Sequence, residues 1–174
     1  MVNRAVIMSM SDKALWDCLS QVSDPEIPAI SIVDLGIVRA IEPSADGRCD
    51  IVITPTYSGC PAMHVIEENI QQVLREQGLT NIQIRTQLSP AWTTDWISDV
   101  GKEKLRAFGI APPARLATGI IDISALSFDD ETDIACPQCG SMHTRLISQF
   151  GSTACKALYR CSDCLEPFDY FKPR

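Results

Sequence analysis

The chain has 174 residues, of which 45% are apolar and 21% charged, and its 22 acidic and 15 basic residues give a net charge of −7. This composition suits a folded core, and the negative charge disfavours nucleic-acid binding, which needs clustered lysine and arginine. No apolar run approaches the roughly 20 residues of a membrane-spanning helix, and the N-terminal apolar stretch is too short for a secretory signal. We therefore expect a cytoplasmic protein with one main domain and a small module, and with no membrane or nucleic-acid partner.

Hydrophobic periodicity predicts alternating helices and strands in the first part of the chain. Ser11 is suited to cap the first helix, Pro61 to begin the second and Gly78 to end it. In chain order, the expected elements are a helix over 11–22, strands over 37–41 and 49–54 joined by a turn at 44–48, a helix over 61–77, a strand over 81–88 and a weaker helix over 95–108. This order predicts a compact α+β (α/β) domain over residues 1–110.

Residues 111–130 have the composition of a linker, which opens at Ala111-Pro112-Pro113-Ala114 and closes at Asp129-Asp130-Glu131. Within it, the stretch 118–128 is apolar enough either to add an edge strand or to pack on a partner, and the sequence leaves both alternatives open. A second, small domain is then expected over residues 131–174.

Cysteine is concentrated in that last segment, because five of the eight cysteines lie in the final forty residues. Cys136 and Cys139, and Cys161 and Cys164, form two Cys-x-x-Cys pairs, the spacing at which two sulfurs converge on one metal. The stretches 144–150 and 156–160 can form a hairpin between the pairs. The pattern predicts a zinc ribbon with four thiolate ligands, although the same set can hold a single iron.

Two further residues of this segment have alternative interpretations. Cys155 is interpreted as a buried small side chain, or else as an additional ligand or transfer thiol. His143 follows the first pair closely, but with four cysteines available it is interpreted as a surface residue.

Cys60 is the candidate functional thiol of the first domain. It lies between Gly59 and Pro61, where a loop becomes a helix, and the unpaired N–H groups at a helix start stabilise a thiolate. The alternative is a buried cysteine that only fills space. His64 lies four residues further on, so a cysteine-dependent thiol enzyme with a Cys–His pair is a second functional hypothesis.

Asp24-Pro25-Glu26 offers two carboxylates in a rigid bend. Such carboxylates can help to bind a metal, but most bends of this kind are solvated turns. Asp34-Leu35-Gly36 is interpreted in the same way, as a turn into the first strand.

Taken together, three motifs resemble the iron–sulfur assembly domain family, which includes the T-type proteins of the SUF pathway. The motifs are Asp24-Pro25-Glu26, Asp34-Leu35-Gly36-Ile37-Val38 and Thr54-Pro55-Thr56-Tyr57-Ser58-Gly59-Cys60-Pro61. The resemblance implies that Cys60 is the functional thiol, with Asp24, Glu26 and Thr56 as its neighbours, and that a transient iron or iron–sulfur cluster is handled there.

The tail, from Gly151 to Cys161 and from Glu166 to Lys172, is similar to that of the D-subunit family of bacterial phenylacetyl-CoA 1,2-epoxidase systems. This resemblance implies a non-catalytic accessory or maturation subunit in aerobic phenylacetate degradation. The implied partners are the oxygenase and reductase subunits and the iron–sulfur assembly machinery. A homodimer formed by adding sheet edges is a further expectation, which comes from the linker prolines, the apolar stretch 118–128 and the accessory role together. The chain contains no Glu-x-x-His motif of a di-iron oxygenase and no glycine-rich dinucleotide fingerprint. A zinc-ribbon protein-interaction module remains a further alternative.

Overall fold

The structure is a computed structural model that describes residues 11–43, 48–113 and 134–174. The chain divides into two compact units, residues 1–101 (unit 1) and 102–174 (unit 2), and the division falls within helix α4 (Asp99–Ala107). The expected turn at 44–48, apart from Arg48, and the apolar stretch 118–128 lie outside the described residues.

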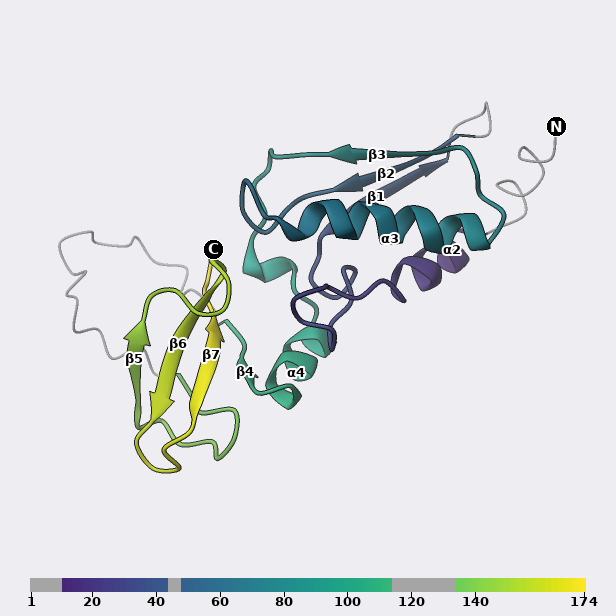
Figure 1. The fold of residues 1–174 in the computed structure, drawn as a ribbon. Coiled ribbons are helices and arrows are strands. Elements are labelled where there is room, and N and C mark those ends of the chain that lie inside the picture. Colours follow the sequence, from purple (N-terminus) through teal and green to yellow (C-terminus); the bar gives the residue numbers. More distant parts are fainter. Residues whose placement is uncertain (1–10, 44–47, 114–133) are drawn as a thin grey trace. The chain divides into compact units, whose positions relative to one another are not determined.

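Unit 1 contains a three-stranded sheet in the order β1-β2-β3 (Figure 1). Its strands are β1 (Val38–Pro43), β2 (Cys49–Ile53) and β3 (Ile82–Thr86). β1 and β2 pair in antiparallel fashion, whereas β2 and β3 are parallel. A parallel pair needs a crossover connection, and the helix α3 (Ala62–Glu76) provides it.

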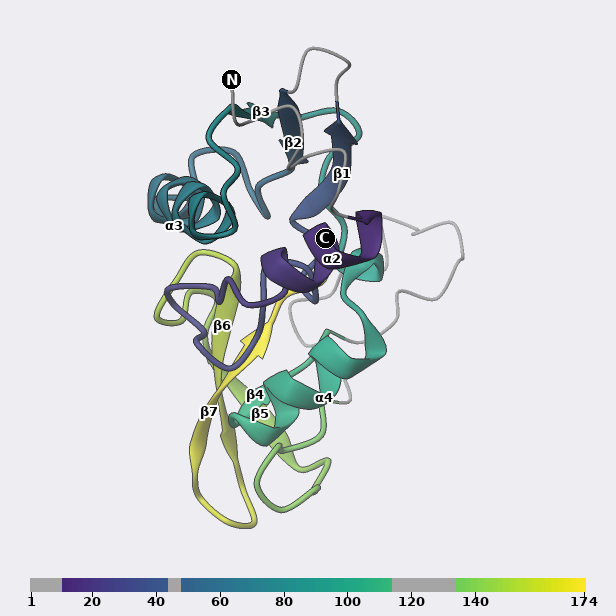
Figure 2. The ribbon, with the colours of Figure 1, turned by 90° about the vertical axis from the view of Figure 1, so that its right-hand side faces the viewer.

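The core of unit 1 lies between the sheet and α3. Ile66, Ile70 and Leu74 recur at helical spacing and are fully buried, as are Ile51 and Ile53 on the central strand. Burial of each such side chain stabilises the fold by about 1.5–3 kcal/mol relative to exposure. The helix α2 (Asp12–Leu19) packs beside α3 (Figure 2), so two helices cover this face of the sheet.

The first helix is shorter than the sequence predicts. Ser11 caps it as expected, because its Oγ accepts a hydrogen bond of 3.2 Å from the N–H of Ala14. The helix ends at Leu19 rather than at Val22 because the carbonyl of Val22 accepts from the N–H of Ile32 at 2.9 Å. The chain thus leaves the helix to pair with a later loop.

The predicted continuous helix over 95–108 is wrong at its start. A short 3-10 turn (Thr94–Trp96) is followed by an extended Ile97, and α4 begins only at Asp99. Ser98 caps α4, since its Oγ accepts from the N–H of Gly101 at 2.9 Å and donates to Oδ1 of Asp34 at 3.0 Å. The break is therefore set by a residue of a distant loop.

Unit 2 contains a four-stranded sheet in the order β4-β7-β6-β5. The strands are β4 (Ile110–Ala111), β5 (Thr144–Ser148), β6 (Lys156–Cys161) and β7 (Pro167–Phe171). β5 and β6 form the predicted hairpin, whereas β4 and β7 are not among the expected elements. Tyr159 packs in the core with its ring centre 5.9 Å from Phe168 and 5.5 Å from Tyr170.

The predicted fold class, an α+β domain followed by a small cysteine-bearing β unit, is confirmed. Within the described ranges, no helix combines the length and the apolar composition required to cross a membrane.

Candidate metal centre and cysteine site

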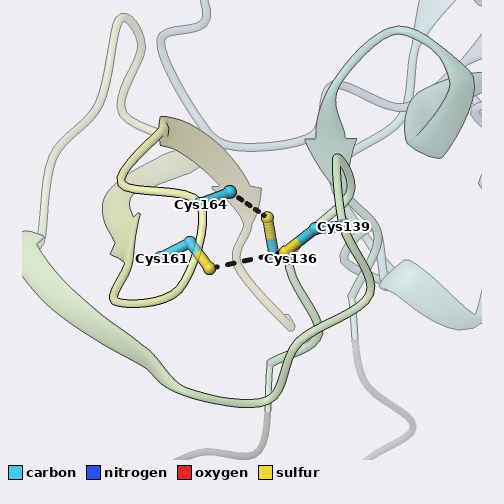
Figure 3. A group of neighbouring side chains, drawn as sticks. All are labelled: Cys136, Cys139, Cys161 and Cys164. Atoms are coloured by element: carbon cyan, nitrogen blue, oxygen red, sulfur yellow. Dashed lines mark hydrogen bonds between the residues drawn. The ribbon is translucent and has the colours of Figure 1, made fainter.

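Four cysteines of unit 2 converge on one point. Cys136 and Cys139 belong to a tight turn before β5 (the first cysteine turn, residues 136–140), and Cys161 and Cys164 to the turn between β6 and β7 (the second cysteine turn, residues 161–165). Their Sγ atoms all lie within 4.8 Å of one another. The Sγ atoms of Cys136 and Cys164 are 3.7 Å apart and those of Cys139 and Cys161 are 3.6 Å apart (Figure 3).

These distances fit a tetrahedral metal ion. A metal–sulfur bond of about 2.3 Å places the sulfurs of a tetrahedral site about 3.8 Å apart. The two observed separations of 3.7 and 3.6 Å are close to that value. A set of four sulfur donors suits zinc or a single iron rather than calcium or magnesium, which bind oxygen.

The thiols of this group differ in how readily they lose a proton. Backbone N–H groups of Cys164 and Asp163 donate to Cys161 and lower the pKa of its thiol to about 6. The N–H of Glu166 donates to Cys164, yet burial and the neighbouring thiols raise the pKa of Cys164 to about 12. The thiolate of Cys161 therefore forms easily, and its negative charge disfavours ionisation of the neighbouring thiols. A bound divalent cation would offset this repulsion between thiolates.

Each cysteine turn ends in a residue with left-handed backbone conformation. Gly140 has φ +75°, and Leu165 holds the matching place after the second pair with φ +65°. This conformation lets each turn fold back sharply, which directs its two sulfurs to the same point.

Cys155 lies outside the group of four. Its side chain is buried, and its Sγ is 3.0 Å from Oγ1 of Thr153. Its role as an additional thiol stays a prediction. His143 has an exposed side chain, and its Nδ1 lies 3.2 Å from Oδ2 of Asp163.

Cys60 occupies the loop immediately before α3. Gly59 has φ +87°, and Pro61 precedes the first helical residue, Ala62. The N–H of Cys60 donates to the carbonyl of Tyr57 at 3.2 Å. Among the three cysteines of unit 1, Cys18 and Cys49 are buried and Cys60 is partly exposed.

The carboxylates of the Asp24–Glu26 bend have different surroundings. Asp24 is buried, and its Oδ1 accepts from the N–H groups of Glu26 at 2.9 Å and Ile27 at 2.8 Å. Glu26 is exposed, and Thr56 is 9% exposed. Asp24 thus closes its own bend, while Glu26 remains accessible.

A hollow of about 360 Å³ lies beside this bend. Asp24 and Pro25 line it from the bend, and Asn69 and Gln72 line it from α3. Cys60 is not one of its lining residues, so the hollow brings Asp24 together with the middle of α3 rather than with the thiol. The expected grouping of Cys60, Asp24, Glu26 and Thr56 stays a prediction.

His64 lies on the exposed face of α3, paired with a carboxylate of the same helix. Its Nε2 lies 3.2 Å from Oε1 of Glu68, one helical turn further on, and both side chains are largely exposed. This is the ordinary i,i+4 pair of a solvated helix face.

Two residues next to the group of four cysteines are not among the site residues that the sequence predicts. Ser141 directly follows the first cysteine turn, and Asp163 lies inside the second. Their side chains are hydrogen-bonded to each other. The sequence contained a signal for both: Ser141 places a hydroxyl two residues after Cys139, and Asp163 places a carboxylate between Cys161 and Cys164.

Two family models match separate parts of the chain. Residues 12–84 match the model described as iron-sulfur cluster assembly protein. Residues 122–172 match the model described as PaaD zinc beta ribbon domain. The first match falls in unit 1 and the second in unit 2.

Some similar proteins match nearly the whole chain, and others match about half of it. The chain is 48% identical over 158 residues to the D subunit of a "Putative 1,2-phenylacetyl-CoA epoxidase" of Escherichia coli (strain K12), covering 91% of this chain and 90% of that protein. It is 32% identical over 82 residues to the Fe-S protein maturation auxiliary factor of Porphyromonas gingivalis, covering 47% and 77%. A crystal structure of a domain of unknown function, DUF59, from Bacillus anthracis matches with a TM-score of 0.51 and 27% identity, covering 54% and 90%.

The names of these relatives describe a subunit and an auxiliary factor, which is consistent with a non-catalytic subunit and supports an accessory role. The extent of the first match, together with the two family models, places the chain in one family. The chain belongs to the D-subunit family of phenylacetyl-CoA epoxidases, and it joins an iron–sulfur cluster assembly domain to a PaaD zinc beta ribbon domain.

Proposed function

We propose that this protein is an accessory subunit of a phenylacetyl-CoA 1,2-epoxidase system and assists the assembly of an iron–sulfur cluster or iron centre in that system. The observation that carries the proposal is the 48% identity to the Escherichia coli protein, a D subunit by name, over nine-tenths of both chains. The weaker similarity to a maturation auxiliary factor supports the same role for the first half of the chain.

Cys60 is the proposed functional thiol. It is the partly exposed cysteine of unit 1, and the glycine before it leaves open space, since no atom beyond its chain neighbours lies within 4 Å of the position that a Cβ would take at Gly59. A partner's backbone or a cluster can therefore approach the loop closely. Asp24, Glu26 and Thr56 are the proposed neighbours, with Glu26 the carboxylate that is accessible to a metal.

Four of the five cysteines of unit 2, Cys136, Cys139, Cys161 and Cys164, are proposed to hold a structural zinc ion, with iron as the alternative. Zinc has no preferred geometry of its own and accepts four thiolates. Such a closed site has no open position for a substrate, so its role is to stabilise the fold of the ribbon. The domains proposed are an assembly-type domain over 1–110, a linker over 111–130 and the ribbon over 131–174.

The oxygenase and reductase subunits and the iron–sulfur assembly machinery are the proposed partners, and a homodimer is the proposed state of the isolated protein. The cytoplasmic location that the composition suggests stays a prediction.

The test is co-expression of the epoxidase subunits with wild-type protein, with Cys60→Ser or with neither. Iron and acid-labile sulfide in the purified epoxidase and its turnover are measured. The proposal expects iron content and turnover to fall without the protein and with Cys60→Ser, and acid-labile sulfide to fall with them where the centre is an iron–sulfur cluster. A fully loaded and active epoxidase in its absence contradicts the proposal. Thioester hydrolysis by the isolated protein, lost in Cys60→Ser, would instead favour the thiol-enzyme hypothesis.

A further inference from the structure

A hydrogen-bonded cluster links the two cysteine turns without using any sulfur. Asp163 lies inside the second cysteine turn, and its Oδ2 accepts from Oγ of Ser141 at 2.5 Å. The same Oδ2 lies 3.2 Å from Nδ1 of His143. One carboxylate thus contacts two residues of the segment that follows the first cysteine turn.

Backbone groups strengthen this link. The N–H of Ser162 donates to the carbonyl of His143 at 2.7 Å, and the N–H of His143 donates to Oγ of Ser141 at 3.0 Å. The carbonyl of Ser141 also accepts from the N–H of Cys136 at 2.9 Å. Segment 141–143 is therefore held to both cysteine turns at once.

The two bridging residues also contact the ligand sulfurs. The backbone N–H of Ser141 donates to the sulfur of Cys139, and the backbone N–H of Asp163 donates to the sulfur of Cys161. The side-chain bond between Ser141 and Asp163 thus joins two peptide groups, each of which orients a ligand from a different turn.

We propose that Asp163, held by Ser141 and His143, is a positioning residue of the metal centre, which fixes the two cysteine turns relative to each other and slows the loss of the metal. The inference rests on the proposed four-cysteine metal site and deepens it. A solvent-exposed hydrogen bond with no such role contributes little, whereas partners that orient metal ligands typically change metal affinity 10- to 100-fold on removal.

The experiment uses the full-length chain loaded with Co²⁺, whose absorption bands report a tetrahedral thiolate site, and competition with Zn²⁺ gives the affinity of the site. Transfer of Zn²⁺ to a coloured chelator gives the release rate. Ser141→Ala and Asp163→Ala should each weaken binding and speed release by about 10-fold. Ser141→Thr keeps the hydroxyl and should restore both values.

Ser152→Ala is the matched control, because Oγ of Ser152 donates to Oδ2 of Asp169 at 3.0 Å in the same unit. It removes the same kind of bond away from the cysteine turns and should leave affinity and release rate unchanged. Where Asp163→Ala fails to fold, Ser141→Ala and Ser141→Thr decide the question by themselves.

Release rates of Ser141→Ala and Asp163→Ala equal to wild type, or no different from Ser152→Ala, would overturn the inference. A wild-type chain that gives no tetrahedral Co²⁺ spectrum would overturn the metal site as well. The result for Cys60 and the epoxidase is independent of either outcome.

Discussion

Two glycines of unit 1 share a left-handed backbone, but their surroundings differ. At Gly36, φ is +70° and a Cβ would lie 2.6 Å from the carbonyl oxygen and 2.7 Å from Cβ of Trp96. At Gly59, φ is +87° and a Cβ would have no atom within 4 Å apart from those of its chain neighbours. The Asp34-Leu35-Gly36 motif predicts a turn, but the sequence does not reveal that Trp96, sixty residues later, packs onto it.

Gly36→Ala should therefore destabilise unit 1 by about 2–4 kcal/mol, because it adds a steric clash with backbone to an unfavourable φ. Gly59→Ala is the control, with the same unfavourable φ and no clash, and should cost about 1 kcal/mol. Urea unfolding followed by tryptophan fluorescence measures both. Equal losses for the two variants would show that the contact with Trp96 is unimportant.

Cysteine reactivity is a second property that depends on single residues. Burial raises the pKa of the Cys18 thiol, with a further rise from the charge of Asp17, and burial followed by the charge of Asp50 raises that of Cys49. Both are shielded in the core, whereas Cys60 is partly exposed. In the folded protein near neutral pH, iodoacetamide should therefore label Cys60 well before Cys18 or Cys49.

Peptide mapping by mass spectrometry after timed quenching measures this order. Labelling in a denaturant is the control, since all three thiols should then react at similar rates. Cys18 or Cys49 labelling as fast as Cys60 in the folded protein would contradict the assignment of Cys60 as the accessible thiol.

At the scale of elements, the local sequence pattern was sufficient to predict the bounds of an element whose ends are set by its own residues. The helix after Cys60 begins and ends within one residue of the expected positions because Pro61 and Gly78 act locally. β7 was missed because Pro167 at its start is unfavourable for a strand and its pairing with β6 comes from chain topology. The start of α4 was misplaced because Asp34 helps to set it.

Ser98→Ala tests that long-range cap. It removes the bond to the N–H of Gly101 and the bond to Asp34, and should cost about 2 kcal/mol of unfolding free energy. Ser11→Ala is the matched control at α2, where the cap accepts from the N–H of Ala14 at an exposed site, and should cost about 0.5–1 kcal/mol. A loss for Ser98→Ala no greater than that for Ser11→Ala would show that Asp34 adds nothing to the cap.

At the scale of the whole molecule, the grouping of the four cysteines could be predicted from their spacing, because two Cys-x-x-Cys pairs have the spacing of one four-sulfur site and a hairpin between them can bring them together. The arrangement around Cys60 could not be predicted in the same way. Its expected neighbours lie on loops whose positions depend on tertiary packing, and the hollow beside Asp24 lies along α3 instead of at the thiol.

The two units differ in what holds them together, which predicts that they unfold separately. Unit 1 has a core of two helices on a sheet, whereas the described part of unit 2, residues 102–113 and 134–174, has only a small core around one sheet and is marginal for folding by core burial alone. A structural zinc can supply about 10–16 kcal/mol to such a segment. Cys161→Ser should therefore remove the metal and unfold unit 2 while unit 1 stays folded.

The aromatic residues allow this to be measured in one protein. All three tryptophans, Trp16, Trp92 and Trp96, lie in unit 1, whereas Tyr159 and Tyr170 lie in the core of unit 2. Cys161→Ser should keep the tryptophan emission and its unfolding midpoint, and lose the bound zinc and the part of the near-ultraviolet dichroism that comes from Tyr159 and Tyr170, while Tyr57 of unit 1 keeps its contribution. Cys155→Ser is the matched control, a buried thiol just before β6 that is not in the group of four, and should keep one zinc and both signals. Loss of the tryptophan transition in Cys161→Ser would show that unit 1 depends on the metal, and zinc loss in Cys155→Ser would make Cys155 a ligand.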